Sequence, residues 1–209
     1  MRMRKRKWVE PYLENEGRYL IRNTEMKGHW LTMPYTCLCL EIGMGMGDFL
    51  IGSARLNPNT LFIGFEKDET CVAKAIRKAT DADVENIWII RDDATKLTEY
   101  FDDGEVDVLY LQFSDPWPKK AHHKRRLTYS SFIALYDKVL KEKGEIVFKT
   151  DNKDLYEFSL VSFAESSFKL VECSVDYHRV PREDICTEYE SKFVSEGLPI
   201  YYARFRKGS

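Results

Sequence analysis

The sequence contains no run approaching the ~20 consecutive apolar residues that a membrane-spanning helix requires. Its basic start is not followed by an apolar stretch, so we expect neither a membrane protein nor a signal peptide. Internal repeats and low-complexity tracts are also missing. At 209 residues, of which 44% are apolar, the chain is long enough for one well-buried core and short for two domains.

Cysteine is scarce and shows no pairing pattern. The five cysteines are an odd number, no two form a Cys-x-x-Cys pair, and the four histidines show no ligand spacing with them. We therefore expect no metal site and no disulfide framework, but reduced and mostly buried thiols in a cytoplasmic protein. The cysteines are Cys37, Cys39, Cys71, Cys173 and Cys186.

The excess of one charge over the other is small, with 32 basic and 34 acidic residues and a net charge of −2. The charges are nevertheless unevenly spread along the chain. Segments 1–7 and 119–126 each carry five positive charges and no acid, whereas segment 81–107 holds ten acids against two basic residues. This asymmetry predicts a basic face that could bind a polyanion such as a nucleic acid.

Strand and helix patterns alternate after a polar, irregular start, which predicts an α/β fold. We expect a doubly wound, mostly parallel seven-stranded sheet with helices on both faces, in a single domain over 37–209. Residues 1–36 are predicted to be a basic and partly flexible N-terminal arm. The expected strands cover 37–42, 61–65, 87–90, 106–113, 145–150, 169–175 and 199–206, and the expected helices cover 47–57, 68–79, 97–101, 128–140 and 155–166, with Asp68 and Thr128 as candidate N-caps.

Acidic residues close several of the predicted strands. In an open α/β sheet, ligands bind beyond the carboxyl ends of the strands, so these side chains are expected to share one site. Acids also favour helix N-caps, but a set this complete is better explained by a cationic or hydroxyl-rich ligand. The strand-ending acids are Glu41, Glu66, Asp92, Asp93, Asp115 and Asp151.

A glycine-rich turn, Glu41 to Gly47, follows the first expected strand, with Gly43 at its start. The turn lacks the Gly-x-Gly-x-x-Gly of a dinucleotide site and the Lys-Ser/Thr of a phosphate loop, and it could equally be a tight structural turn. Glu66 ends the next strand, where a carboxylate can accept both hydroxyls of a ribose. Acids with no basic residue nearby favour the positively charged S-adenosylmethionine over NAD, which carries a pyrophosphate.

The segment Phe113-Ser114-Asp115-Pro116-Trp117-Pro118-Lys119-Lys120 follows an apolar strand and runs into a basic cluster. Two prolines stiffen a loop at the place where α/β proteins put their chemistry. The cluster suits a phosphate backbone. Together they indicate an enzyme that acts on a nucleic-acid base.

These residues, with Lys-Arg-Arg-Leu-Thr-Tyr at 124–129, Phe-Lys-Thr-Asp-Asn at 148–152 and Thr-Glu-Tyr-Glu at 187–190, resemble the bacterial tRNA (guanine-N7)-methyltransferases over essentially the whole chain. The resemblance implies a class I methyltransferase fold, S-adenosylmethionine as cofactor, tRNA as partner and guanine 46 of the variable loop as methyl acceptor. It places the cofactor on Glu41, Gly43, Glu66, Asp93 and Asp115, with Asp115 also catalytic. It places the substrate on Lys119, Asp151, Thr187, Glu188, Tyr189 and Glu190, and RNA on Lys120, Lys124, Arg125 and Arg126.

The sequence differs from the family pattern at Gln112, Ala121, His123 and Lys153-Asp154. Four alternatives remain open: an amino-group methyltransferase, a methyltransferase acting on another RNA base, a non-catalytic RNA-binding protein with this fold, and a nicotinamide-dependent enzyme. We expect a monomer or a homodimer.

Overall fold

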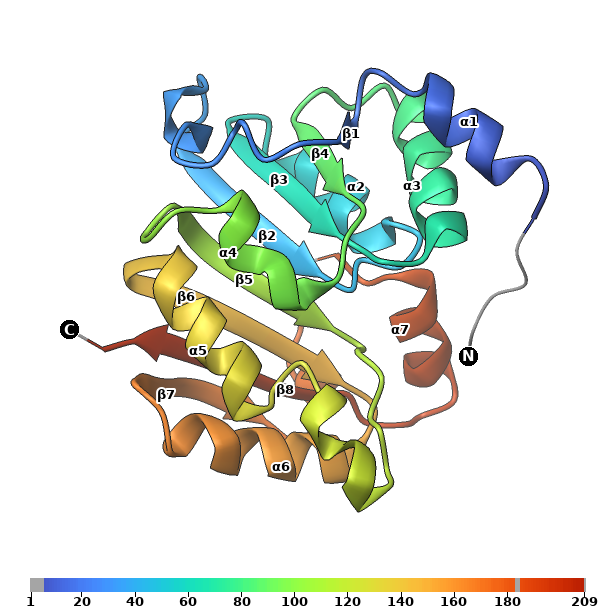
Figure 1. Ribbon diagram of the computed structural model, residues 1–209. Helices are drawn as coiled ribbons and strands as arrows, with labels where there is room; N and C mark the ends of the chain where they lie inside the picture. The colour runs from blue at the N-terminus through green and yellow to red at the C-terminus, as the bar shows by residue number, and fades with distance from the viewer. Residues whose placement is uncertain (1–5, 183–184, 209) are drawn as a thin grey trace.

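The computed structural model describes residues 6–182 and 185–208 and contains one sheet of eight strands (Figure 1). The predicted doubly wound α/β fold is confirmed, with one strand more than expected, because the two-residue β1 adds to one edge. In spatial order the strands are β1 (Leu20–Ile21), β4 (Ile87–Ile90), β3 (Thr60–Phe65), β2 (Cys37–Ile42), β5 (Val106–Gln112), β6 (Leu140–Thr150), β8 (Tyr201–Lys207) and β7 (Phe168–Ser174).

In spatial order, all pairings from β1 to β6 are parallel. The strand β8 runs in the opposite direction, so its pairings with β6 and with β7 are both antiparallel. The chain builds outward from β2 to β3 and β4, then returns to the other side of β2 to place β5. The order of the strands therefore reverses between β2 and β5. Ligands bind at such a switch point, beyond the carboxyl ends of the strands.

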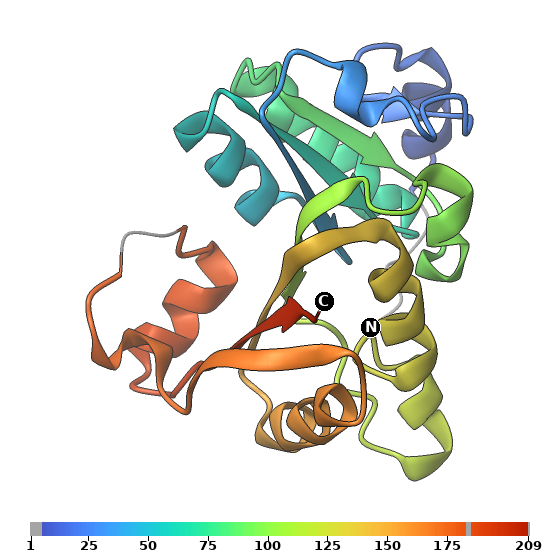
Figure 2. The ribbon, with the colours of Figure 1, turned by 90° about the vertical axis from the view of Figure 1, so that its left-hand side faces the viewer.

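Helices cover both faces of the sheet, as Figures 1 and 2 show. The helices α4 (Leu97–Tyr100), α5 (Ser130–Val139) and α6 (Lys153–Ala164) pack on one face. The helices α1 (Val9–Asn15), α2 (Asp48–Leu56) and α3 (Glu69–Asp81) pack on the other, and α7 (Glu188–Ser195) stands on that same side (Figure 2). No helix in the described ranges is both long and apolar enough to cross a membrane.

Local sequence signals account for one predicted cap and fail for the other. Asp68 caps α3 as predicted, since its carboxylate accepts the backbone N–H groups of Thr70 and Cys71. The prediction that Thr128 caps α5 is wrong, because Tyr129 occupies the N-cap position. Thr128 is buried, and its hydroxyl accepts a 2.7 Å hydrogen bond from Ser159 of α6, so it joins two helices.

Much of the segment predicted as an N-terminal arm packs against the rest of the domain. Val9 and Leu13 of α1 are buried against α3, and the Tyr19 hydroxyl donates a hydrogen bond to the Ala79 carbonyl. The Trp30 indole N–H donates to the carbonyl of Tyr100 at 2.9 Å. Residues 1–5, which carry three of the basic side chains of segment 1–7, lie outside the described residues.

Candidate active site

A cavity of about 240 Å³ opens beyond the carboxyl ends of β2, β3, β4 and β5, at the switch point of the sheet. Residues that end these strands, with the loop after β5, make most of its wall. The lining residues are Ile42, Gly43, Phe65, Glu66, Lys67, Asp92, Asp93, Ala94, Phe113, Ser114, Asp115, Trp117, Arg125, Leu127 and Phe132.

The glycine turn between β2 and α2 forms one wall, and its backbone needs glycine. Gly43, Gly45 and Gly47 all have positive φ, at 76°, 55° and 77°. A side chain at Gly47 would also place its Cβ 3.0 Å from the Cβ of Ala75 on α3. The turn can therefore lie close against both α3 and the cavity only because these positions lack side chains.

Glu66 ties the glycine turn to the end of β3. Its carboxylate accepts the backbone N–H of Gly45 at 3.1 Å and that of Asp68 at 2.8 Å. Burial raises the pKa of Glu66, while the hydrogen bonds from these backbone groups oppose the rise. The carboxylate is held in place and still has lone pairs free for further hydrogen bonds at the cavity wall.

Glu41 lies behind the turn and is not part of the cavity lining. Its side chain is 3% exposed, and in the described part of the chain Oε2 has no hydrogen-bond partner. Burial, reinforced by the nearby carboxylates of Asp48 and Glu66, raises the pKa of Glu41 well above its ordinary value.

Two neighbouring acids after β4 are fixed by local hydrogen bonds. Asp93 caps the 3₁₀ helix η2 (Ala94–Lys96) by accepting the N–H and hydroxyl of Thr95. Burial would raise the pKa of Asp93, but these bonds and the nearby ammonium of Lys67 lower it overall. Asp92 accepts the Tyr100 hydroxyl at 2.9 Å. Both carboxylates therefore reach the rim in a set orientation.

The expectation that no basic residue lies near these acids is wrong. Lys67 directly follows Glu66 in the lining, and Arg125 is brought to the cavity from the basic cluster. The guanidinium of Arg125 stacks over the Trp117 ring, 5.0 Å from its centroid. The wall keeps an acidic excess of four carboxylates over two cations, so it remains suited to a positively charged ligand.

The loop that carries Asp115 has an unusual backbone held by hydrogen bonds to β6 and to Arg126. Phe113 and Trp117 have φ of 51° and 41°, a left-handed conformation that bulky side chains rarely adopt. The Phe113 N–H donates to the carbonyl of Lys149 on β6 at 3.0 Å, and the buried Arg126 donates to the Pro116 carbonyl at 2.9 Å. These contacts leave Asp115 exposed at the cavity wall.

The structure separates the predicted RNA-binding cations into two groups. Lys120, Lys124 and Arg125 are exposed on or beside the 3₁₀ helix η3 (Lys120–Arg125), next to the exposed Lys119. Arg126 is only 3% exposed and lies over the Phe158 ring at 4.5 Å. Its charge is used inside the protein, to brace the Asp115 loop.

The predicted substrate residues of the last third of the chain meet beside this loop. Asp151 directly follows β6, and Thr187 is the N-cap of α7, where its hydroxyl accepts the N–H of Glu190. The Tyr189 ring is half-exposed and packs 5.1 Å from the Phe113 ring, and the tyrosine lies close to Asp151. Burial and this acid together raise the pKa of Tyr189.

Comparison with known proteins identifies the family. A family model described as "Putative methyltransferase" matches residues 35–203. A Streptococcus mutans protein named tRNA (guanine-N(7)-)-methyltransferase is 44% identical over 213 residues, covering 99% of this chain and 100% of the relative. A Streptococcus sanguinis protein of the same name is 45% identical over 208 residues, covering 96% and 97%. The chain belongs to the tRNA (guanine-N7)-methyltransferase family.

Solved structures place this family member's fold among the methyltransferases. The 16S rRNA methyltransferase KamB has a TM-score of 0.68 at 15% identity and covers 92% of this chain and 99% of its own. TrmN from Thermus thermophilus has a TM-score of 0.58 at 19% identity and covers 83% and 44%. At these identities the likeness establishes the fold, and it confirms a Rossmann-like class I methyltransferase.

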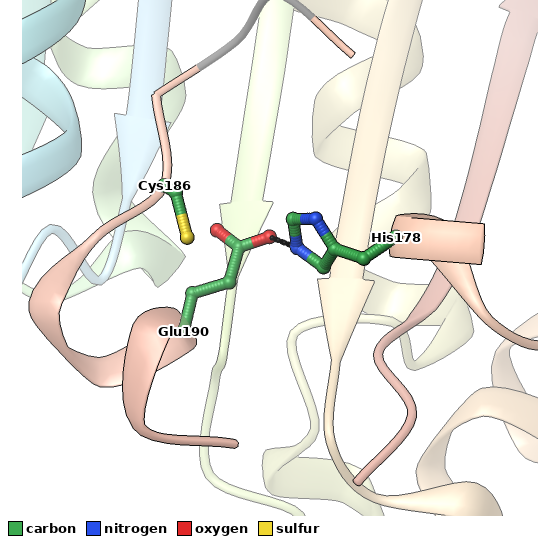
Figure 3. A group of neighbouring side chains, drawn as sticks. All are labelled: His178, Cys186 and Glu190. Carbon is green, nitrogen blue, oxygen red and sulfur yellow. Dashed lines mark hydrogen bonds and ion pairs between the residues drawn. The ribbon is translucent and has the colours of Figure 1, made fainter. Parts of the chain in front are cut away.

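Within this methyltransferase fold, Glu190 is not among the residues that line the cavity, and its carboxylate points toward His178 (Figure 3). Its carboxylate lies 3.1 Å from the Lys149 ammonium and 2.8 Å from His178 Nε2, and both Glu190 and Lys149 side chains are 1% exposed. No pattern in the sequence assigned a role to Lys149 or His178. Thr-x-x-Glu at 187–190 is a capping-box pattern, in which the Glu190 carboxylate would accept the backbone N–H of Thr187. In the structure this carboxylate instead accepts a hydrogen bond from Lys149.

His178, Cys186 and Glu190 also form the group of described residues closest to a metal-binding arrangement. Their ligand atoms lie within 4.8 Å of one another (Figure 3). The ammonium of Lys149 already neutralises the carboxylate, however, and a divalent cation there would face that fixed positive charge. Cys186 instead lies near the Ser191 hydroxyl at 3.2 Å. We therefore describe the cluster as a buried ion pair with a histidine at its edge.

The positions that depart from the family pattern lie in different surroundings. Gln112 is buried on the α7 side of the sheet, where Nε2 has no partner among the described residues and the side chain lines a second cavity of about 320 Å³. Ala121 is exposed in η3, and His123 contacts the Phe158 ring. Lys153 pairs with Glu157 at the start of α6. Only Ala121 and His123 therefore lie in the loop that carries the exposed cations.

Proposed function

We propose that the protein transfers a methyl group from S-adenosylmethionine to N7 of guanine 46 in the variable loop of tRNA. The observation that carries the proposal is the continuity of two surfaces through the Asp115 loop. Asp115 and Trp117 line the acidic cavity, and the chain continues directly into the exposed cations Lys119, Lys120 and Lys124. The family supplies the reaction type, and the resemblance supplies the position of the guanine.

The cavity residues fit this cofactor. Glu66 offers carboxylate oxygens at the end of β3, where they can accept the ribose hydroxyls, and Asp92 and Asp93 offer oxygens at the neighbouring rim. Glu41 Oε2 is a buried acceptor that needs a donor, and an ammonium group reaching through the glycine turn would supply one. Glu41, Gly43, Glu66, Asp93 and Asp115 are therefore the cofactor residues in this proposal.

When bound, S-adenosylmethionine supplies an electrophilic methyl group on a sulfonium to the lone pair of guanine N7 and leaves as neutral S-adenosylhomocysteine. N7 carries no proton, so the protein needs no general base before the transfer. Its task is to hold the base in line and to stabilise the positive charge that arrives on it. Asp115 is placed to do this, because it is exposed at the cavity wall on a loop that Arg126 and Lys149 hold.

The guanine would occupy the edge between the Asp115 loop and α7. Guanine presents two donors on its Watson–Crick edge, the N1–H and the exocyclic amine, and Asp151 with Glu188 and Tyr189 offers acceptors and a ring there. Lys119, Lys120, Lys124 and Arg125 would contact tRNA phosphates. Glu190 contributes through the position it gives to this segment, because its own carboxylate is buried.

The deciding experiment is transfer of labelled methyl from S-adenosylmethionine to unmodified tRNA with guanine at position 46, followed by nucleoside analysis. A matched tRNA carries adenine at that position. We expect N7-methylguanosine in the first tRNA and none in the second. Methylation at an exocyclic nitrogen would show an amino-group methyltransferase. Equal N7 methylation of both tRNAs would show that the methyl acceptor is a guanine other than guanine 46. Binding of tRNA without cofactor binding would instead show a non-catalytic RNA-binding protein.

A further inference from the structure

The Lys149–Glu190 ion pair joins two segments that border the proposed guanine site. Lys149 lies near the carboxyl end of β6, two residues before Asp151, and Glu190 lies in the first turn of α7. The ammonium lies 3.1 Å and 3.5 Å from the two carboxylate oxygens. Since both side chains are 1% exposed, this contact is shielded from solvent and stronger than a surface pair.

Two further side chains hold this pair. His178, from the 3₁₀ helix η4 (Tyr177–Arg179), places Nε2 2.8 Å from the same carboxylate. The Tyr177 ring lies under the Lys149 ammonium at 4.1 Å. The pair is thus held from β6, from η4 and from α7, which fixes the start of α7 relative to the sheet.

The same residues connect directly to the Asp115 loop. The backbone carbonyl of Lys149 accepts the N–H of Phe113, the residue that begins the loop in a left-handed conformation. The Phe113 ring packs against the ring of Tyr189, the residue that directly precedes Glu190. A displacement of the ion pair would therefore move Tyr189, and with it the contact between the Tyr189 ring and Phe113 of the Asp115 loop.

We propose that Lys149 and His178 are positioning residues for methyl transfer, which hold Glu190 and thereby set Thr187 and Tyr189 against the Asp115 loop. This inference rests on the proposed function, since it concerns the geometry of the guanine site. It assigns Glu190 an indirect part in the reaction: its carboxylate holds the start of α7, and the neighbouring residues contact the base. Lys149 and Glu190 then act as one unit.

A double-mutant cycle in kcat tests this assignment. The variants are Lys149→Met, Glu190→Gln and the double variant, measured with tRNA under saturating cofactor. We expect each single variant to lower kcat by about tenfold. The kcat of the double variant should lie within about twofold of the kcat of the less active single variant, because both substitutions remove the same contact. KM for tRNA should change by less than about threefold, since the exposed cations remain. Losses that multiply in the double variant would overturn the proposal and show that Glu190 reads the base directly.

Further variants separate positioning from stability and from metal binding. The double variant leaves no buried charge unpaired, so it should fold even if a single variant does not. Lys149→Arg keeps a cation for Glu190 and should restore kcat to within about threefold of the unaltered protein. Cys186→Ser, next to the pair, should leave kcat unchanged. A loss in Cys186→Ser equal to that in His178→Ala would overturn the proposal in favour of a metal site.

Hydrogen exchange gives a readout that needs no activity. In Lys149→Met, the amides of 186–195 should exchange faster than in the unaltered protein, while those of β2 and β3 and the affinity for S-adenosylmethionine stay unchanged. Unchanged exchange in 186–195 would overturn the proposal. If the unaltered protein methylates no tRNA, the proposed function fails, whereas faster exchange in the variant would still support the ion pair as the element that holds α7.

Discussion

Arg126 Nε lies 2.9 Å from the carbonyl oxygen of Pro116, so a residue of the basic cluster braces the loop that carries Asp115. A second bond of 3.4 Å runs from the same guanidinium to the carbonyl of Trp117. A planar guanidinium can hold both carbonyls at once, and lysine, with a single nitrogen, lacks this geometry. The loop geometry therefore depends on an arginine at this position.

Arg126→Lys should lower kcat without weakening tRNA binding. Loss of a buried, charged hydrogen bond costs about 1.5–3 kcal/mol. If this whole cost appears as a higher activation free energy for methyl transfer, kcat falls by roughly 10- to 100-fold. Affinity for tRNA should stay within about twofold, because Arg126 is buried. Steady-state kinetics and filter binding measure the two effects. Weakened binding with normal kcat would mean that Arg126 contacts RNA after all.

The exposed cations should govern the salt dependence of tRNA binding. We expect Lys124→Ala to reduce the slope of log affinity against log salt by about 0.7–0.9, as for the loss of one phosphate contact. Lys138→Ala removes an equally exposed charge from the far end of α5 and is the matched control, with an unchanged slope. Equal slopes for Lys124→Ala and the unaltered protein would remove η3 from the RNA-binding surface.

Asp115→Asn should remove most methyl transfer while tRNA still binds. The amide is nearly the same size as the carboxylate but offers no negative charge to offset the charge arriving on guanine, and losses of one stabilising group are about 100- to 1,000-fold in kcat. Single-turnover methyl transfer with the isolated variant measures the step. Turnover within about threefold of normal would contradict a catalytic role for Asp115.

Glu41→Gln should change the pH dependence of stability. Because burial raises the pKa of Glu41, the folded protein keeps a proton that the unfolded chain has released above about pH 4.3. The free energy of unfolding therefore falls as pH rises from there to the raised pKa. Glutamine has no such proton, so the variant should gain stability relative to the unaltered protein over this range. Urea unfolding at a series of pH values tests it, and parallel curves would contradict the prediction.

Gly47→Ala should destabilise the fold and weaken cofactor binding. A left-handed residue with a Cβ costs about 1–2 kcal/mol, and here the new atom would also press on Ala75 at 3.0 Å. Gly197→Ala is a close control, since its φ is 69° and no heavy atom lies within 4 Å of the added carbon. Denaturant unfolding measures the free energy of unfolding that each variant loses. The additional loss in Gly47→Ala over Gly197→Ala gives the cost of the contact with α3. Equal losses would mean that this contact carries no energy.

Sequence patterns that act over a few residues predicted much of the fold and of the cavity. The alternation of apolar strands with helices indicated the sheet, and Asp68 was recognised as a cap because its partners are two and three residues away. The acids that end β3, β4 and β5 were expected to meet, and Glu66, Asp93 and Asp115 do line one cavity. This follows because parallel strands bring their carboxyl ends to the same edge.

Contacts between distant segments were not accessible in the same way. Lys149 and Glu190 are 41 residues apart, and a lysine between Phe148 and Thr150 on a strand gives no sign that it will be buried beside a helix. Arg126 looks like one more solvated cation in its cluster. Only the folded chain shows that it turns inward to a loop ten residues earlier. The strand β1 is too short, at two residues, for any periodicity to reveal it.

The position of β8 also constrains the order in which this protein can assemble. β8 is the last strand along the chain but lies inside the sheet, between β6 and β7. β7 pairs with no strand except β8, so it cannot join the sheet ahead of β8. The edge of β6 stays open until residues 201–207 arrive from more than fifty positions further along the chain, and such distant pairing is slow. The α7 segment lies between β7 and β8 in sequence, so the proposed guanine site is complete only when β8 has joined the sheet.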